Sequence, residues 1–123
     1  MATVELTKEN IKPEVEGSEI TVLDFWAPWC APCKAFGPTF EAVSESHSDI
    51  LFGKVNTQEQ EQLGAHFNIR SIPTLMIIRE GVMLYSEPGA LAKPDLEDLI
   101  AQIRAVDMDE IHAEVAKLKA EGA

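Results

Sequence analysis

Residues 24–34 read Asp24-Phe25-Trp26-Ala27-Pro28-Trp29-Cys30-Ala31-Pro32-Cys33-Lys34, and the rest of the chain is organised around them. This segment contains both cysteines of the chain, at C-x-x-C spacing. An apolar, β-branched run leads into it and predicts a strand, and the residues that follow have helical periodicity. Two thiols at this spacing can form a disulfide with each other and can exchange it with another protein through a mixed disulfide. In an intracellular chain, C-x-x-C near a strand–helix–strand pattern indicates a redox motif.

Half of a zinc site has the same C-x-x-C spacing, so zinc binding is the alternative interpretation of the two cysteines. Structural zinc sites need four ligands. The chain has no second C-x-x-C, and its three histidines, His47, His66 and His112, do not have metal-ligand spacing. We therefore expect no metal site.

Length and charge limit the class of protein. At 123 residues the chain has the size of one globular domain, and its apolar content of 46% is typical of a soluble protein. The net charge of −11 argues against nucleic acid and anionic membranes as partners, because both attract basic surfaces. No apolar run is long enough to span a bilayer.

The cysteine content predicts the compartment. Residues 1–10 have neither the basic nor the apolar region of a signal peptide, and the chain has only two cysteines. In a reducing compartment a disulfide is usually transient and catalytic. We therefore expect a cytoplasmic protein.

Hydrophobic periodicity predicts an α/β fold. The near-continuous apolar run at 20–26 is typical of a strand that is covered on both faces. Glu80-Gly81 is a turn signal between two β-rich runs, which predicts an antiparallel hairpin. We expect a mixed sheet of about five strands, parallel in its first part, with helices on its faces. The predicted strands are 3–6, 20–26, 50–55, 74–79 and 82–86. Four helices are predicted: a short one that begins after the N-cap Thr7, one over 34–47 with a kink at Pro38, one over 58–67, and one whose apolar face consists of Leu96, Leu99, Ile100 and Ile103.

Two side chains of the central segment have positions that favour acid–base chemistry. Cys30 falls at the start of a predicted helix, where unpaired N–H groups and the helix dipole stabilise a thiolate, so it is the expected nucleophile. Asp24 interrupts the apolar strand, and burial there would raise the pKa of its carboxyl and make it a candidate base. The alternative for Asp24 is a strand-end carboxylate that faces water.

With these residues in hand, the chain resembles the thioredoxin family over roughly residues 3–106. Several segments match the family at the family's spacings. They are Asp24 to Ala27, Trp29-Cys30-x-Pro32-Cys33-Lys34, Lys54-Val55-Asn56, Ile69-Arg70-Ser71-Ile72-Pro73-Thr74, Gly81 and Gly89-Ala90.

The resemblance implies a thioredoxin fold and the activity of a protein-disulfide reductase. Cys30 would attack a substrate disulfide, Cys33 would resolve the mixed disulfide, and Asp24, with Lys54 nearby, would assist proton transfer. The alternative for Lys54 is an ordinary surface lysine. Ile72–Pro73 would be a cis peptide bond that presents backbone to the substrate. The apolar docking surface around Cys30 would consist of Trp29, Ala31, Pro32, Ile72, Pro73, Gly89 and Ala90.

The resemblance also implies partners. They would be disulfide-containing target proteins and a thioredoxin reductase, a separate flavoprotein that supplies electrons from NADPH. The chain itself has no nucleotide-binding glycine motif, so we expect no bound cofactor. We expect a monomer.

Two alternatives remain, one redox and one non-redox. A disulfide oxidant or isomerase is disfavoured by Pro32, because those branches of the family usually have His before the second cysteine. A binding module could use the same surface with redox state as a switch, and would keep its function if both cysteines were changed to Ser.

The chain departs from the family pattern at Ala31 and at its end. Ala31 stands where the commonest family motif has Gly. We divide the chain into a thioredoxin domain, 1–106, and a helical C-terminal extension, 107–123. Asp107 and Glu110 have the spacing of a capping box. The apolar stripe formed by Met108, Ile111, Val115 and Leu118 indicates either a helix that packs on its own domain or frays, or a partner-binding surface.

Overall fold

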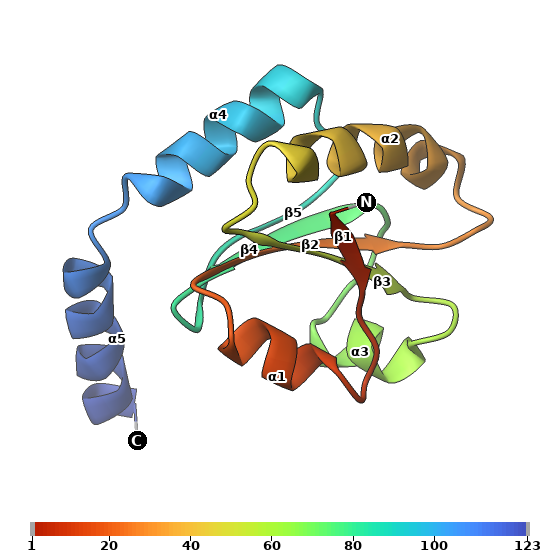
Figure 1. Cartoon of the computed structure of the whole chain (residues 1–123). Helices are drawn as coiled ribbons and strands as arrows, with labels where there is room; N and C mark the ends of the chain where they lie inside the picture. The colour runs from red at the N-terminus through yellow and green to blue at the C-terminus, as the bar shows by residue number, and fades with distance from the viewer. Residues whose placement is uncertain (1, 123) are drawn as a thin grey trace.

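A computed structural model describes residues 2–122, and it has a five-stranded sheet between two layers of helices (Figure 1). Helices α2 (Ala31–Glu45) and α4 (Lys93–Arg104) cover one face, and α1 (Ile11–Glu16) and α3 (Glu61–His66) cover the other. The predicted α/β class and mixed sheet are confirmed. The strands are β1 (Thr3–Glu5), β2 (Ile20–Trp26), β3 (Leu51–Asn56), β4 (Thr74–Arg79) and β5 (Val82–Pro88).

The sheet has the strand order β1-β3-β2-β4-β5, which places β2 at its centre. β3 is parallel to both β1 and β2, whereas β4 is antiparallel to β2 and β5 is antiparallel to β4. β2 is buried along nearly its whole length because helices cover both of its faces. The near-continuous apolar run of this strand follows from that position.

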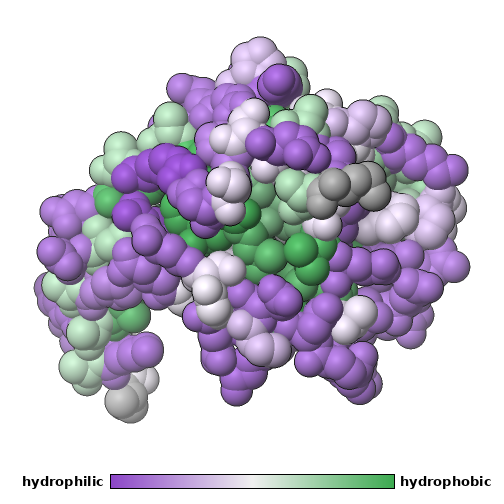
Figure 2. All heavy atoms as spheres, viewed as in Figure 1, coloured by the Kyte–Doolittle hydropathy of each residue, from purple (hydrophilic) through white to green (hydrophobic). Residues whose placement is uncertain are grey.

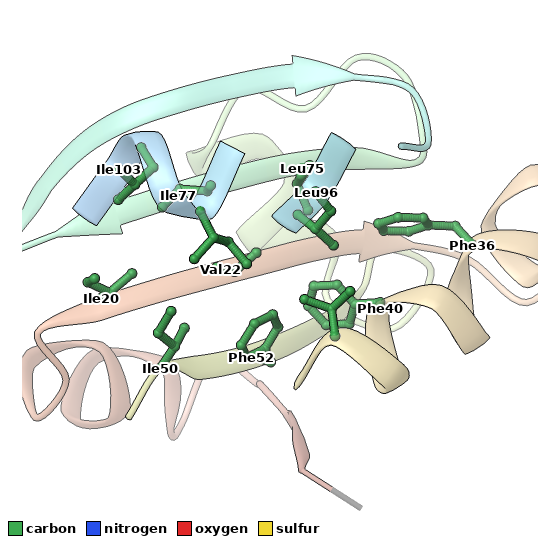
Figure 3. Close-up of a cluster of buried hydrophobic side chains, with 12 residues drawn as sticks. Ile20, Val22, Phe36, Phe40, Ile50, Phe52, Leu75, Ile77, Leu96 and Ile103 are labelled. Carbon is green, nitrogen blue, oxygen red and sulfur yellow. The ribbon is translucent and has the colours of Figure 1, made fainter. Parts of the chain in front are cut away.

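Two apolar cores fill the spaces between the layers. On the α2 and α4 side, Phe40 of α2 packs edge-to-face on Phe52 of β3, with ring centroids 5.4 Å apart (Figure 3). The same core contains Leu96, Ile100 and Ile103, so the helical stripe predicted for α4 is confirmed. On the α1 and α3 side the buried core consists of Leu6, Ile11, Leu23, Phe25, Val55, Leu63 and Met76.

Three helix predictions need correction. α1 begins at Ile11, and Thr7 is not its N-cap; the Thr7 backbone amide instead donates to Asn10 Oδ1 in a turn that precedes the helix. α2 has Cys30 as its N-cap and continues past Pro38, both as predicted, but its bounds differ from the predicted segment 34–47, because it begins at Ala31 and ends at Glu45. α3 is shorter than predicted, because Asn56 Oδ1 accepts hydrogen bonds from the backbone amides of Gln58 and Glu59 and holds them in a turn.

The C-terminal residues form helix α5 (Met108–Gly122), which lies at one side of the molecule, outside the two helix layers (Figure 1). Asp107 Oδ1 accepts from the Glu110 amide at 3.3 Å, which confirms the predicted capping by Asp107. Of the predicted apolar stripe, Met108 is buried, whereas the side chain of Leu118 is 61% exposed. The division into two domains stays a prediction.

Arg79, at the end of β4, joins the sheet to the segment between α4 and α5. Its Nη1 atom donates to the backbone carbonyl oxygens of Ile103, Arg104 and Val106 at 2.8, 3.4 and 3.1 Å. Next to it, Glu80 accepts from the His112 ring of α5 at 2.8 Å. These contacts fix the first turns of α5 relative to the sheet.

The face of the molecule that Figure 2 draws is mainly polar, with an apolar area near its centre. Figure 2 shows hydrophilic side chains over most of the visible face, as the excess of acidic residues predicts. None of the helices that the structure describes is long and apolar enough to cross a membrane.

Candidate functional site

The two cysteines form a disulfide at the start of α2. Cys30 is the N-cap residue, with its Cα 5.2 Å from that of Cys33. The Cys33 backbone amide donates to Cys30 Sγ at 3.3 Å. After reduction, the same amide and the helix dipole would stabilise a Cys30 thiolate. The side chains are 5% and 2% exposed, so Cys30 is the more accessible of two buried residues.

The Ile72–Pro73 peptide bond is cis, as the family resemblance implied, and it lies against the disulfide. The Ile72 carbonyl oxygen is 3.8 Å from Cys30 Sγ. The Gly89 amide donates to the Pro73 carbonyl at 2.8 Å, which brings the end of β5 to the same place. Gly89 has a φ of +108°, a backbone conformation that residues other than glycine rarely adopt.

The predicted docking residues lie on several loops and on the first turn of α2, which carries Ala31 and Pro32. Trp29 is 71% exposed, and Ala31, Pro32, Gly89 and Ala90 are also exposed. Pro73 is buried, and Ile72 is partly buried against the cysteines. A hollow of about 470 Å³ lies between Trp29 and Ile72. Part of the lining of this hollow was not predicted from the sequence, although two of these residues, Arg70 and Ser71, directly precede Ile72. The lining residues that were not predicted are Thr57, Glu61, Gly64, Ala65, Ile69, Arg70 and Ser71.

Asp24 is fully buried in β2, so the alternative of a water-facing carboxylate is wrong. Neither of its carboxylate oxygens has a hydrogen-bond partner among the described residues. Burial raises the pKa of Asp24 to about 7, although the nearby Lys54 ammonium lowers it. A carboxyl with this pKa can gain and lose a proton near neutral pH.

Lys54 lies beside Asp24 because the two residues pair across β2 and β3. Lys54 Nζ is 4.8 Å from the centre of the Trp26 ring, in a cation–π contact. Trp26 also packs against the cluster of Ala27, Cys30 and Cys33. Trp26 therefore links the lysine and the disulfide.

The histidines do not assemble a metal site. Within residues 2–122, no three His, Cys, Asp or Glu side chains are grouped as metal ligands. His47 pairs with Glu97, and His112 pairs with Glu80.

The sequence matches the Thioredoxin family over residues 2–102. The chain belongs to the thioredoxin family. A Streptomyces coelicolor protein named "Putative thioredoxin 2" is 50% identical over 120 residues, which cover 98% of this chain and 90% of the relative. Thioredoxin of Porphyra purpurea is 39% identical over 102 residues, covering 81% of this chain and 95% of the relative.

Solved thioredoxin structures have the same fold. Spinach chloroplast thioredoxin f, in its short form, superposes with a TM-score of 0.77 at 31% identity, covering 85% of this chain and 95% of the other. A mutant thioredoxin of Halobacterium salinarum has a TM-score of 0.78 at 23% identity, covering 85% and 93%, and supports the fold. Family membership and the Cys30–Cys33 pair identify a thiol–disulfide oxidoreductase.

Proposed function

We propose that this thioredoxin reduces disulfides in other proteins, with Cys30 as the nucleophile and Cys33 as the resolving thiol. The Cys30 thiolate attacks one sulfur of a substrate disulfide, a Cys30–substrate bond forms, and the other substrate sulfur leaves as a thiolate. Cys33 then attacks Cys30 Sγ. The mixed disulfide breaks, the second substrate thiol leaves, and two electrons have passed from the protein to the substrate.

Asp24 acts as the base for the second step. The Cys33 thiol must lose a proton before it attacks, and the Asp24 carboxylate accepts this proton, through water. Its position supports this role: Asp24 and Val22 lie on the same face of β2, and Val22 packs in the core beneath α2, the helix that carries Cys33. Lys54 tunes Asp24, since its ammonium favours the ionised carboxylate.

Substrate docks as an extended segment beside Ile72–Pro73, where backbone groups can pair with it in the manner of an added strand. Trp29, Ala31, Pro32, Gly89 and Ala90 supply the surrounding contact surface. Residues 1–106 form the redox domain, and residues 107–123 are an extension of it. The protein acts as a monomer in the cytoplasm, where a separate NADPH-dependent flavoprotein, thioredoxin reductase, restores the Cys30–Cys33 dithiol.

The single observation that supports this function best is the Cys30–Cys33 disulfide at the N-terminus of α2, beside the cis Ile72–Pro73 bond. The test is turbidimetric reduction of insulin with NADPH and a thioredoxin reductase, comparing wild type with Cys30→Ser. We expect turnover by the wild type and none by the variant. Absence of wild-type turnover despite a reducible disulfide contradicts a general reductase. A reduction potential well above about −200 mV would instead favour a disulfide oxidant or isomerase.

A further inference from the structure

A second cavity lies at Lys54, the residue that pairs with Asp24 across β2 and β3, and none of the predicted docking residues lines it. It has a volume of about 340 Å³ and is lined by Thr3, Glu5, Trp26, Glu41 and Lys54. None of these residues lines the hollow between Trp29 and Ile72. Glu5 is exposed and lies on the edge strand β1, so the cavity reaches solvent at the opposite edge of the sheet from β5.

Buried polar atoms without protein partners gather around this cavity. Glu41 Oε2 accepts from the Thr3 hydroxyl at 2.7 Å, but Glu41 Oε1 is buried and has no partner among the described residues. The same holds for the indole N–H of Trp26, which also lines the cavity, and for both carboxylate oxygens of Asp24, which does not line the cavity but pairs with Lys54. Leaving such groups unpaired costs about 1–3 kcal/mol each, so a set of them in one place calls for a function or for water. The cavity is large enough to hold water.

Lys54 connects Asp24 to the cavity. It pairs with Asp24 across β2 and β3, it lines the cavity, and on its other side it pairs with Glu5 across β1 and β3. On the other side of β2, the residue of β4 that pairs with Asp24 is Leu75, which is apolar and buried. The polar surroundings of Asp24 within the sheet therefore extend towards Lys54 and the cavity.

We propose that this cavity is the route by which Asp24 exchanges its proton with solvent, and that the Glu41 carboxylate accepts the proton on the way. After Cys33 has given its proton to the Asp24 carboxylate, a step that rests on the proposed function, the neutral Asp24 passes the proton to water in the cavity. The Glu41 carboxylate takes it up and releases it to solvent. Both carboxylates return to the ionised form, and no electrons move.

This route keeps proton release apart from substrate binding. The docking surface is covered while a mixed disulfide exists, and Asp24 must become ionised again before it can serve as a base in the next cycle. The charged groups around the route are Lys54 from β3, Glu5 from β1 and Glu41 from α2. The alternative is that Glu41 only ties α2 to β1 through its hydrogen bond to Thr3.

Two variants separate these roles. Glu41→Gln removes the proton acceptor but keeps an oxygen that can accept from Thr3, whereas Thr3→Val removes the hydrogen bond and keeps the carboxylate. The readout is the rate at which the ¹³C-labelled Asp24 carboxyl exchanges its proton, measured by relaxation dispersion at the midpoint of its titration. Glu41→Asp, which restores a carboxylate, is the conservative rescue.

We expect Glu41→Gln to slow the exchange about tenfold, less than the roughly 10²- to 10⁴-fold loss when a direct base is removed. Thr3→Val and Glu41→Asp should stay close to wild type, and added formate, which can enter the cavity, should restore the rate in Glu41→Gln. An unchanged rate in Glu41→Gln, or an equal loss in Thr3→Val, overturns the role of Glu41. The base role of Asp24 fails separately, if Asp24→Asn resolves mixed disulfides as fast as wild type.

Discussion

Asp24 on β2 and Lys54 on β3 pair across the middle of the sheet, which places an ammonium group beside a fully buried carboxylate. The two effects on Asp24 have opposite signs. Burial raises the pKa of its carboxyl, Lys54 lowers it, and burial is the larger effect, so the pKa of Asp24 is about 7. The position of the lysine therefore keeps a buried acid within reach of neutral pH.

Replacing Lys54 with Met should raise the pKa of Asp24 above about 7, because only the ammonium favours the ionised form. The measurement is a ¹³C NMR titration of the Asp24 carboxyl. Lys117→Met is the matched control, since Lys117 lies exposed on α5 and should leave the titration unchanged. A lower or equal pKa in Lys54→Met would mean that Lys54 does not act on Asp24.

Replacing Asp24 with Asn should stabilise the protein at neutral pH. Between pH 3.8 and about pH 7 the folded state binds a proton at Asp24 that the unfolded state does not. The free energy of unfolding therefore falls as the pH rises through this window, and it stays lower at higher pH. Asn does not ionise, so the variant does not pay the cost of a buried charge. Its gain in the free energy of unfolding over wild type should approach about 4 kcal/mol above pH 7 and vanish at low pH. Urea unfolding at several pH values measures it. A gain that is independent of pH contradicts this account.

Replacing Arg79 with Lys should destabilise the fold. The guanidinium donates to three backbone carbonyl oxygens between Ile103 and Val106, and a lysine ammonium cannot reproduce this geometry. Loss of a hydrogen bond to a charged group costs about 1.5–3 kcal/mol, and denaturant unfolding measures the change. Arg70→Lys, at an exposed residue, is the control and should have little effect. If the two variants were equally stable, the Arg79 hydrogen bonds to the end of α4 would not contribute to the stability of the fold.

Substitutions along α5 should distinguish packing from self-association. Met108→Glu should lower the stability because Met108 is buried, whereas Leu118→Glu should change neither stability nor mass because Leu118 is 61% exposed. Light scattering at increasing protein concentration gives the mass. A wild-type mass above that of one chain, which Leu118→Glu reduces, would contradict the proposed monomer and make the stripe an interface.

Much of the fold could be predicted because its signals are local in the sequence. The apolar run of β2 and the Glu80-Gly81 turn each indicate one structure, and both predictions are confirmed. The start of α1 could not be predicted, because Thr7 is a good N-cap residue by type but its backbone amide bonds to Asn10 in a turn. The local sequence is compatible with both a helix N-cap and a turn at Thr7, and it does not distinguish between them.

The site was predictable in its chemistry and less so in its surroundings. The place of Asp24 in an apolar strand predicted burial as one of two alternatives, and the structure decides for burial. By contrast, Glu41 and Thr3 come from different elements, 38 residues apart, and only the packing of α2 against β1 joins them. Arg79 likewise looks like the last residue of a strand, and its bonds to the end of α4 depend on tertiary structure.

The most direct test of the assigned roles is to trap the mixed disulfide. The reduced variants Cys33→Ser and Cys30→Ser are each mixed with a disulfide-containing protein, and the adducts are identified by mass spectrometry. We predict that Cys33→Ser accumulates an adduct through Cys30, because no resolving thiol remains, and that Cys30→Ser forms almost none. An adduct through Cys33 in the Cys30→Ser variant, formed at a comparable rate, would contradict the assignment of Cys30 as the nucleophile.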